Sequence, residues 1–191
     1  MDIKSVIVNR RAVYPTLFSG EEVESNVIDK MLELANWAPT HKNSEPWRFK
    51  VYSKKAKNRL LDQCKHCYIQ ETNGETFNHH KVKKIEERKT SVSHIIAICM
   101  ERNEHLLPEF EEIASVAMAV QNMWLYLAST QKYGGYWSTP NYALGEEFSG
   151  FLNLAKDERC LGLFYIGTIK KDILLPKGVR GDWQEKVDYH F

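Results

Sequence analysis

The sequence predicts an α+β protein with one sheet of four or five strands, mixed or antiparallel, flanked by helices. Helical and strand-like periods follow one another irregularly, without the strict strand–helix–strand order of parallel folds. Two continuous apolar runs, 95–100 and 161–168, suit strands that are buried on both faces. A longer apolar segment over 108–132 is rich in small residues, so we expect a long, buried central helix there.

The composition fits one domain that spans residues 1–191, since no repeat or linker divides the chain. Hydrophobic residues make up 43% and charged residues 27% of the sequence, which argues against disorder. The formal net charge is +1 and the charges are interspersed, so neither nucleic acid nor a membrane surface is expected as the main partner.

The sequence also bears on the compartment. No apolar run reaches the roughly 18 residues that a membrane-spanning helix needs. The stretch Met1–Ser5 lacks the apolar core and cleavage site of a signal peptide, so we expect a cytoplasmic protein. In that compartment the four cysteines are expected to be free thiols.

A short helix is predicted over 2–10, and it ends at two adjacent arginines, Arg10 and Arg11. Cations at a helix end can simply offset the helix dipole. They can also form an anion site, because guanidinium groups donate paired hydrogen bonds to phosphate oxygens. The residues alone leave both interpretations open.

A polar loop bounded by two prolines lies between the next helix and the first strand. This helix has candidate N-terminal caps at Ser19 and Ser25, and Pro39 disfavours a helical conformation just before it. The loop contains His41, and residues 47–52 then alternate apolar and polar as in a half-buried strand. Rigid elements on both sides suit this loop to ligand binding, although an ordinary surface connection has the same frame.

Two further helices are predicted over 53–67 and 78–89, and the second is so strongly charged that we expect it to face solvent. The segment 64–91 is a candidate mobile cover over a site. Cys64 and Cys67 have the C-x-x-C spacing of some zinc and redox sites. The adjacent histidines downstream do not supply a second spaced ligand pair, so a metal or dithiol site is the weaker interpretation.

The C-terminal half is predicted to combine the long central helix with two strands. Pro108 suits a first helical position, and Gly134 and Gly135 are expected to end the helix. Residues 136–140 should form a short strand that leads into a turn, and 146–155 should form a short helix.

Several segments resemble the nitroreductase-like flavin oxidoreductases, and together they cover nearly the whole chain. They are the Ala-Pro…Pro-Trp-x-Phe pattern of 38–49, the Arg-Arg end of the first helix, the Gln-Asn-Met-Trp-Leu run of the long helix, the Gly-Gly-x-Trp-x-Thr segment of 134–139, the Gly-x-x-x-Ile-Gly strand and the Arg-x-Asp-Trp-x-Glu-x-Val ending. Ala12 replaces the family's usual serine, and Asp182 replaces its usual proline. The resemblance implies a nitroreductase-like fold whose long helix lies at a dimer interface.

The resemblance also implies an FMN phosphate site. Arg10 and Arg11 match the arginines that hold the phosphate, and Arg180 matches the C-terminal arginine that completes the site. The backbone amide of Ala12 remains available to the flavin although the hydroxyl is lost.

The same resemblance implies two further contacts with the cofactor. Trp137, Ser138 and Thr139 correspond to the segment that runs along the flavin. Trp37 and His41 belong to the loop that reaches the flavin of the partner subunit, so each site would be shared between two chains. The flavin N5 carries the chemistry in such enzymes, so neither a catalytic side chain nor a metal ligand is expected.

The function that we expect is FMN-dependent oxidoreduction. NADH or NADPH would reduce FMN, and a nitroaromatic, quinone or similar small acceptor would then take its place in a ping-pong reaction. The alternatives are a metal- or dithiol-binding protein centred on Cys64 and Cys67, or a flavin-binding module without turnover.

Overall fold

The computed structural model describes residues 2–72 and 74–191, and its centre is one antiparallel sheet. The four strands lie in the order β1-β2-β4-β3, and each neighbouring pair is antiparallel. Their bounds are β1 Trp47–Ser53, β2 His94–Glu101, β3 Tyr133–Ser138 and β4 Glu158–Thr168. The prediction of an α+β fold around one sheet is confirmed, and the sheet is wholly antiparallel.

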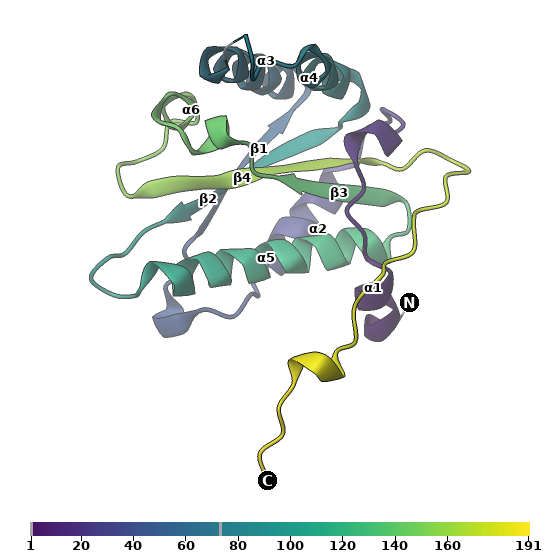
Figure 1. The fold of residues 1–191 in the computed structure, drawn as a ribbon, viewed down its shortest axis with the longest axis vertical. Helices are drawn as coiled ribbons and strands as arrows, with labels where there is room; N and C mark the ends of the chain where they lie inside the picture. Colours follow the sequence, from purple (N-terminus) through teal and green to yellow (C-terminus); the bar gives the residue numbers. More distant parts are fainter. Residues whose placement is uncertain (1, 73) are drawn as a thin grey trace.

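Helices cover both faces of the sheet (Figure 1). One face is covered by α2 (Ser25–Ala35) and α5 (Glu109–Ser129), with α1 (Ile3–Asn9) packed on α5. The other face is covered by α3 (Lys54–Glu71), α4 (His79–Ser91) and α6 (Glu146–Phe151). Short 3₁₀ helices lie at Pro15–Leu17, His41–Asn43, Asn141–Leu144 and Gln184–Lys186.

Strand β2 shows why this sequence forms a three-layer structure. Successive side chains of a strand point to opposite faces, and every residue from His94 to Met100 is buried. Ile96 and Ile98 pack with α2 and α5, whereas Ile95 and Ala97 pack with α3. A strand that is apolar at every position therefore needs helices on both faces, as the run 95–100 predicted.

The end of α5 differs from the prediction. The helix ends at Ser129, and Gln131 takes a left-handed conformation with φ 57°, so the two glycines do not terminate it. They lie in β3 instead, where a Cβ atom on Gly134 would be 2.6 Å from Val13 and one on Gly135 would be 2.3 Å from Phe164. These glycines are required by close packing rather than by a helix stop.

Smaller differences concern element ends. The helix starts at Ser25, as one of the two predicted starts, but its N-cap is Glu24 and neither serine side chain caps it. The Ser19 hydroxyl accepts from the Glu21 amide in a local turn. Helix α3 extends four residues beyond the predicted 67, and α6 is shorter than the predicted 146–155.

One side of α5 remains uncovered. Its sheet-facing side is buried, but Phe110 is 69% exposed, and Ile113 and Met118 are also exposed.

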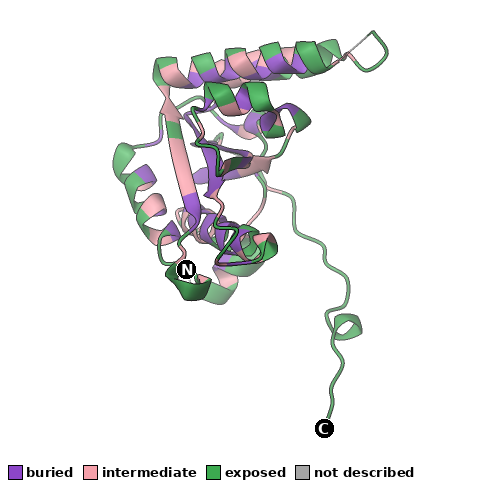
Figure 2. Ribbon diagram, turned by 90° about the vertical axis from the view of Figure 1, so that its left-hand side faces the viewer, coloured by how far each residue is buried: buried purple, intermediate pink, exposed green. Residues whose placement is uncertain are grey.

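Beyond β4, the C-terminal tail leaves the body of the protein and is almost wholly exposed (Figure 2). No helix in the described ranges combines the length and apolarity that crossing a membrane requires.

Candidate functional site

The C-terminal tail passes α1 (Figure 1). Arg10, Arg11 and Arg180 gather where α1 ends. Helix α1 ends at Asn9, and Arg10 turns the backbone into an extended conformation. The Arg10 guanidinium lies 4.4 Å from the centre of the Trp124 ring. Burial, together with the charges of Arg180 and Arg11, holds the pKa of Arg10 below its usual range. The predicted Arg10, Arg11 and Arg180 are therefore brought together.

This arginine cluster has no internal counter-charge. In residues 2–72 and 74–191, the arginines that form ion pairs are Arg48, Arg102 and Arg159. Cations that repel one another at a partly buried place favour binding of an anion, because an anion removes the repulsion. Ala12 is exposed beside the cluster, and its amide donates no hydrogen bond to any described residue.

A groove lies on the α3–α4 side of the sheet, and one of its lining residues, Tyr14, follows the cluster closely in sequence. It consists of two neighbouring cavities of about 580 and 560 Å³, and Lys84 and Arg88 line both. The first includes Tyr14 and Tyr136, whose ring centres are 4.7 Å apart. Because four residues span at most about 14 Å, Tyr14 lies within that distance of Arg10.

Helix α4 supplies the positive charge of the groove. Lys81, Lys84, Ile85 and Arg88 are spaced three and four residues apart, which places them on one helical face, and all four line the groove. Arg88 donates to the Tyr165 hydroxyl at 3.0 Å.

Of the acidic residues of α4, Glu87 also lines the groove, whereas Glu86 pairs with Lys65 of α3. The prediction that this helix faces solvent holds for most of its residues, and one of its faces, where Ile85 is buried, also forms a groove wall. The three- and four-residue spacing of its cations was the available signal.

The predicted residues on β3 divide between the two faces of the sheet. Ser138 lines the groove. Trp137 packs on the α2–α5 side, and its indole N–H donates to the Leu161 carbonyl at 3.3 Å. The Thr139 hydroxyl donates to the same carbonyl at 3.1 Å. Because side chains alternate along a strand, Tyr136 joins Ser138 on the groove side, and the sequence reasoning missed it.

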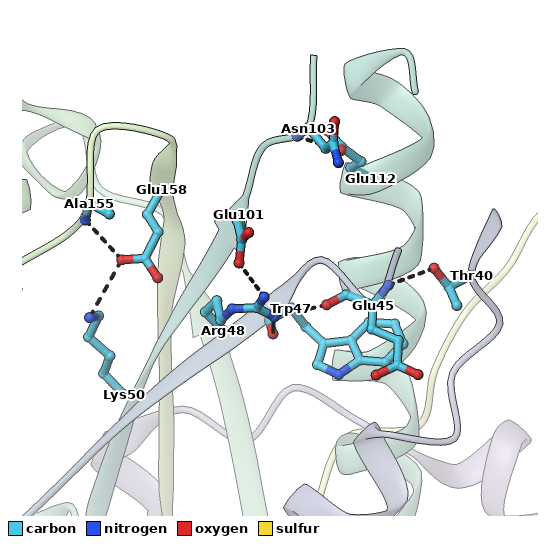
Figure 3. A network of polar contacts seen from close by, with 10 residues as sticks. All are labelled: Thr40, Glu45, Trp47, Arg48, Lys50, Glu101, Asn103, Glu112, Ala155 and Glu158. Atoms are coloured by element: carbon cyan, nitrogen blue, oxygen red, sulfur yellow. Dashed lines mark hydrogen bonds and ion pairs between the residues drawn. The ribbon is translucent and has the colours of Figure 1, made fainter. Parts of the chain in front are cut away.

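The Pro-bounded loop lies outside its own chain's groove. Trp37, which is 79% exposed, lines a separate surface cavity with residues of α1, α2 and α5. His41 Nδ1 lies 2.6 Å from a carboxylate oxygen of Glu111 at the start of α5. Figure 3 shows part of the loop's support, where the Glu45 amide donates to the Thr40 hydroxyl at 3.1 Å. Trp37 and His41 therefore do not meet the arginine cluster within one chain.

Cys64 and Cys67 lie in the interior. Both are buried free thiols on the side of α3 that faces the core. Among the described residues, no group of three or more His, Cys, Asp or Glu side chains is placed to hold a metal ion.

Comparison with known proteins identifies the family. The chain is 25% identical over 166 residues to YfhC of Bacillus subtilis (strain 168), a candidate NAD(P)H nitroreductase, and the match covers 86% of this chain and 83% of YfhC. A nitroreductase-like protein from Bacillus cereus has a TM-score of 0.83 at 26% identity, covering 100% of this chain and 96% of its own.

A third comparison shows the shared fold at lower identity. The FMN-dependent nitroreductase NfnB from Mycobacterium smegmatis, solved in complex with NADPH, gives a TM-score of 0.75 at 16% identity, covering 98% of this chain and 97% of its own. The sequence profile described as the nitroreductase family matches residues 7–168. The chain belongs to the nitroreductase family, as its motifs predicted.

Proposed function

We propose that this chain is an FMN-dependent oxidoreductase that takes hydride from NADH or NADPH and reduces a small acceptor such as a nitroaromatic or a quinone. Family membership supports an oxidoreductase, and the related YfhC is named for NAD(P)H. The structural neighbour NfnB from Mycobacterium smegmatis is named as FMN-dependent. The observation that carries the proposal is the cluster of Arg10, Arg11 and Arg180 without a carboxylate partner.

The residues present fit FMN. The arginine cluster would neutralise its phosphate, and the free amide of Ala12 would donate to a phosphate or ribityl oxygen. The adjoining groove offers aromatic side chains and the Ser138 hydroxyl for a flat polar ring. When bound, FMN supplies the hydride and electron chemistry, and the protein supplies position and charge.

The groove residues have distinct tasks in this proposal. Tyr14 and Tyr136 form an aromatic wall, and Lys84 and Arg88 provide positive charge beside it. Trp137 and Thr139, which both donate to Leu161, hold β3 against β4 and so fix the position of Ser138. We expect reductant and acceptor to occupy the same open groove in turn, which gives ping-pong kinetics.

We further propose a homodimer. The uncovered side of α5 continues into exposed apolar residues of α1, and Ile3 is 67% and Ile7 53% exposed. Trp37 extends this surface next to a cavity of about 450 Å³. A second copy would bury this surface and would bring Trp37 and His41 to the partner subunit's groove.

The function is tested on the purified protein. We expect a yellow protein that releases FMN on heating and oxidises NADH or NADPH when an acceptor is present. FMN binding without any NAD(P)H oxidation would favour the alternative of a flavin-binding module without turnover. A colourless protein that also fails to take up added FMN would overturn the proposal.

The shared site is tested with a mixed dimer. One chain carries Arg10→Glu, and the other carries Trp37→Ala with His41→Ala; each homodimer is expected to be inactive. If sites are shared, the heterodimer has one intact site, so about half of the activity per dimer returns. A purified heterodimer with no recovered turnover would show that all three residues serve one site within one chain.

A further inference from the structure

We propose that Arg11 is a positioning residue that ties the C-terminal tail to the end of α1 and thereby holds Arg180 beside Arg10. This inference rests on the proposed FMN site and changes the role of one of its predicted members. Arg11 then acts on the phosphate through Arg180 and does not contact it.

The Arg11 guanidinium is already occupied by backbone carbonyls. Its Nε donates to the Pro176 carbonyl at 3.1 Å. Its Nη1 donates to the carbonyls of Val8 at 2.7 Å and of Arg10 at 2.6 Å. Val8 and Arg10 belong to the end of α1, whereas Pro176 belongs to the tail. One side chain therefore joins two segments that are 165 residues apart.

The tail has few other attachments. Among the described residues of 171–191, the Pro176 carbonyl takes part in the single hydrogen bond to the rest of the chain. Leu175 adds an apolar contact, because it lines a cavity of about 210 Å³ with Trp124 and Gly134. Beyond Gly181, every residue of the tail is exposed.

Gly178 packs directly on Arg11. A Cβ atom at this position would lie 2.6 Å from both Cζ and Nη2 of Arg11, so only glycine permits the present arrangement. The tail thus crosses the face of the guanidinium between Pro176, which accepts its hydrogen bond, and Arg180.

The consequence for Arg180 follows from charge. Arg180 is exposed, and its one hydrogen bond is to the carbonyl of its neighbour Val179. Its positive charge repels that of Arg10, so this repulsion would drive an untethered tail away from the cluster. The bond from Arg11 to Pro176 resists this and keeps two cations ready for one anion, which reduces the ordering cost of binding.

A double-mutant cycle tests the proposal in the apoprotein, with FMN itself as the probe. Arg11→Lys keeps the charge, but its single ammonium nitrogen cannot occupy the two separate positions from which Nε and Nη1 donate to the tail and to the end of α1. We expect Arg11→Lys and Arg180→Ala each to weaken FMN binding about tenfold, and the double variant to be no weaker than Arg180→Ala alone. Losses that multiply to about a hundredfold would mean that Arg11 contacts the phosphate itself, and would overturn the proposal.

A second pair of variants leaves Arg11 in place. Gly178→Ala should displace the guanidinium and weaken FMN binding to a similar degree as Arg11→Lys. Gly181→Ala is the matched control in the same tail, because its Cβ would meet only Lys186 Nζ at 3.5 Å, an ordinary contact. Equal affinities of Gly178→Ala and Gly181→Ala would contradict the proposal.

Tail release gives a readout that does not depend on FMN. Trypsin should cleave after Lys177 faster in Arg11→Lys and Gly178→Ala than in the wild type or Gly181→Ala, with unchanged far-UV circular dichroism. Unchanged cleavage in the first two variants would overturn the tether. If the wild type bound no FMN, the proposed function would fail, while this measurement would still decide whether Arg11 holds the tail.

Discussion

Arg102 and Arg10 are both half-buried arginines, but only one of them has a counter-charge. Arg102 donates to Glu112, whose side chain is fully buried in the first turn of α5, at 2.5 Å. Glu112 also accepts from the Asn103 amide at 2.9 Å (Figure 3). Arg10 instead lies against Trp124 and near two further cations. A paired charge holds the start of α5 in place, whereas an unpaired cluster is available to a ligand.

The largest effect that we expect from this comparison is on stability. Arg102→Ala leaves the Glu112 carboxylate buried without a cation, so the free energy of unfolding should fall by about 3–5 kcal/mol. Arg159→Ala is the control, because its pair with Glu109 is 52% and 41% exposed and should contribute at most about 1 kcal/mol. Urea denaturation measures both. Similar losses in the two variants would remove the distinction between buried and exposed pairs.

The next effect is on cofactor binding. Arg10→Glu should leave the protein folded but colourless, since losing a charge-assisted contact costs on the order of 2–4 kcal/mol of binding. Arg59→Glu is the matched control, because Arg59 is exposed on α3 away from the cluster. Flavin content and the FMN affinity of the apoprotein are the measurements. If Arg10→Glu retains near-normal FMN affinity, the phosphate assignment is wrong.

The cluster also shows what sequence could and could not predict. Arg10 and Arg11 could be recognised in the sequence as candidate anion ligands, because they are adjacent at a helix end. The bond from Arg11 to Pro176 was not readable, because it depends on where a tail 165 residues away crosses α1. Local pattern therefore shows that two arginines share a helix end, but not which of them bonds to the tail.

The sheet could likewise be predicted from the sequence, whereas the groove could not. The strands β2 and β4 could be predicted because short, continuous apolar runs are typical of buried strands, and both strands lie where the sequence predicted them. The groove wall formed by α4 could not be predicted, because charged residues lie all around that helix and only its packing against α3 decides which face lines the groove. The role of Gly135 was also misread, since its close neighbour Phe164 belongs to another strand.

A smaller effect tests the groove. Lys84 lines both cavities and has no ion-pair partner among the described residues, so its charge is available to an anionic part of NAD(P)H or of an acceptor. We expect Lys84→Gln to keep its FMN and to lose about three- to tenfold in kcat/KM, with a smaller loss at high salt. Lys83→Gln is the control, since Lys83 is 75% exposed and pairs with Glu87. Equal kinetics of the two variants would exclude a role for Lys84.

The smallest effect should come from Cys64→Ser combined with Cys67→Ser. Burial raises the pKa of the Cys64 thiol to about 12 and also raises that of Cys67, so neither is a thiolate near neutral pH. A thiol in that state is a weak nucleophile and a weak metal ligand, so we expect no redox or metal chemistry from Cys64 and Cys67. Serine retains a polar atom for the hydrogen bond between Cys64 and Tyr142.

We therefore expect the double serine variant to keep the wild-type flavin content and rate of NAD(P)H oxidation, even if its unfolding midpoint falls slightly. Spectroscopic flavin content, turnover and denaturation, measured on one preparation, separate these quantities. Lost turnover with flavin still bound would revive the dithiol alternative, because a structural defect would lower stability and flavin content together.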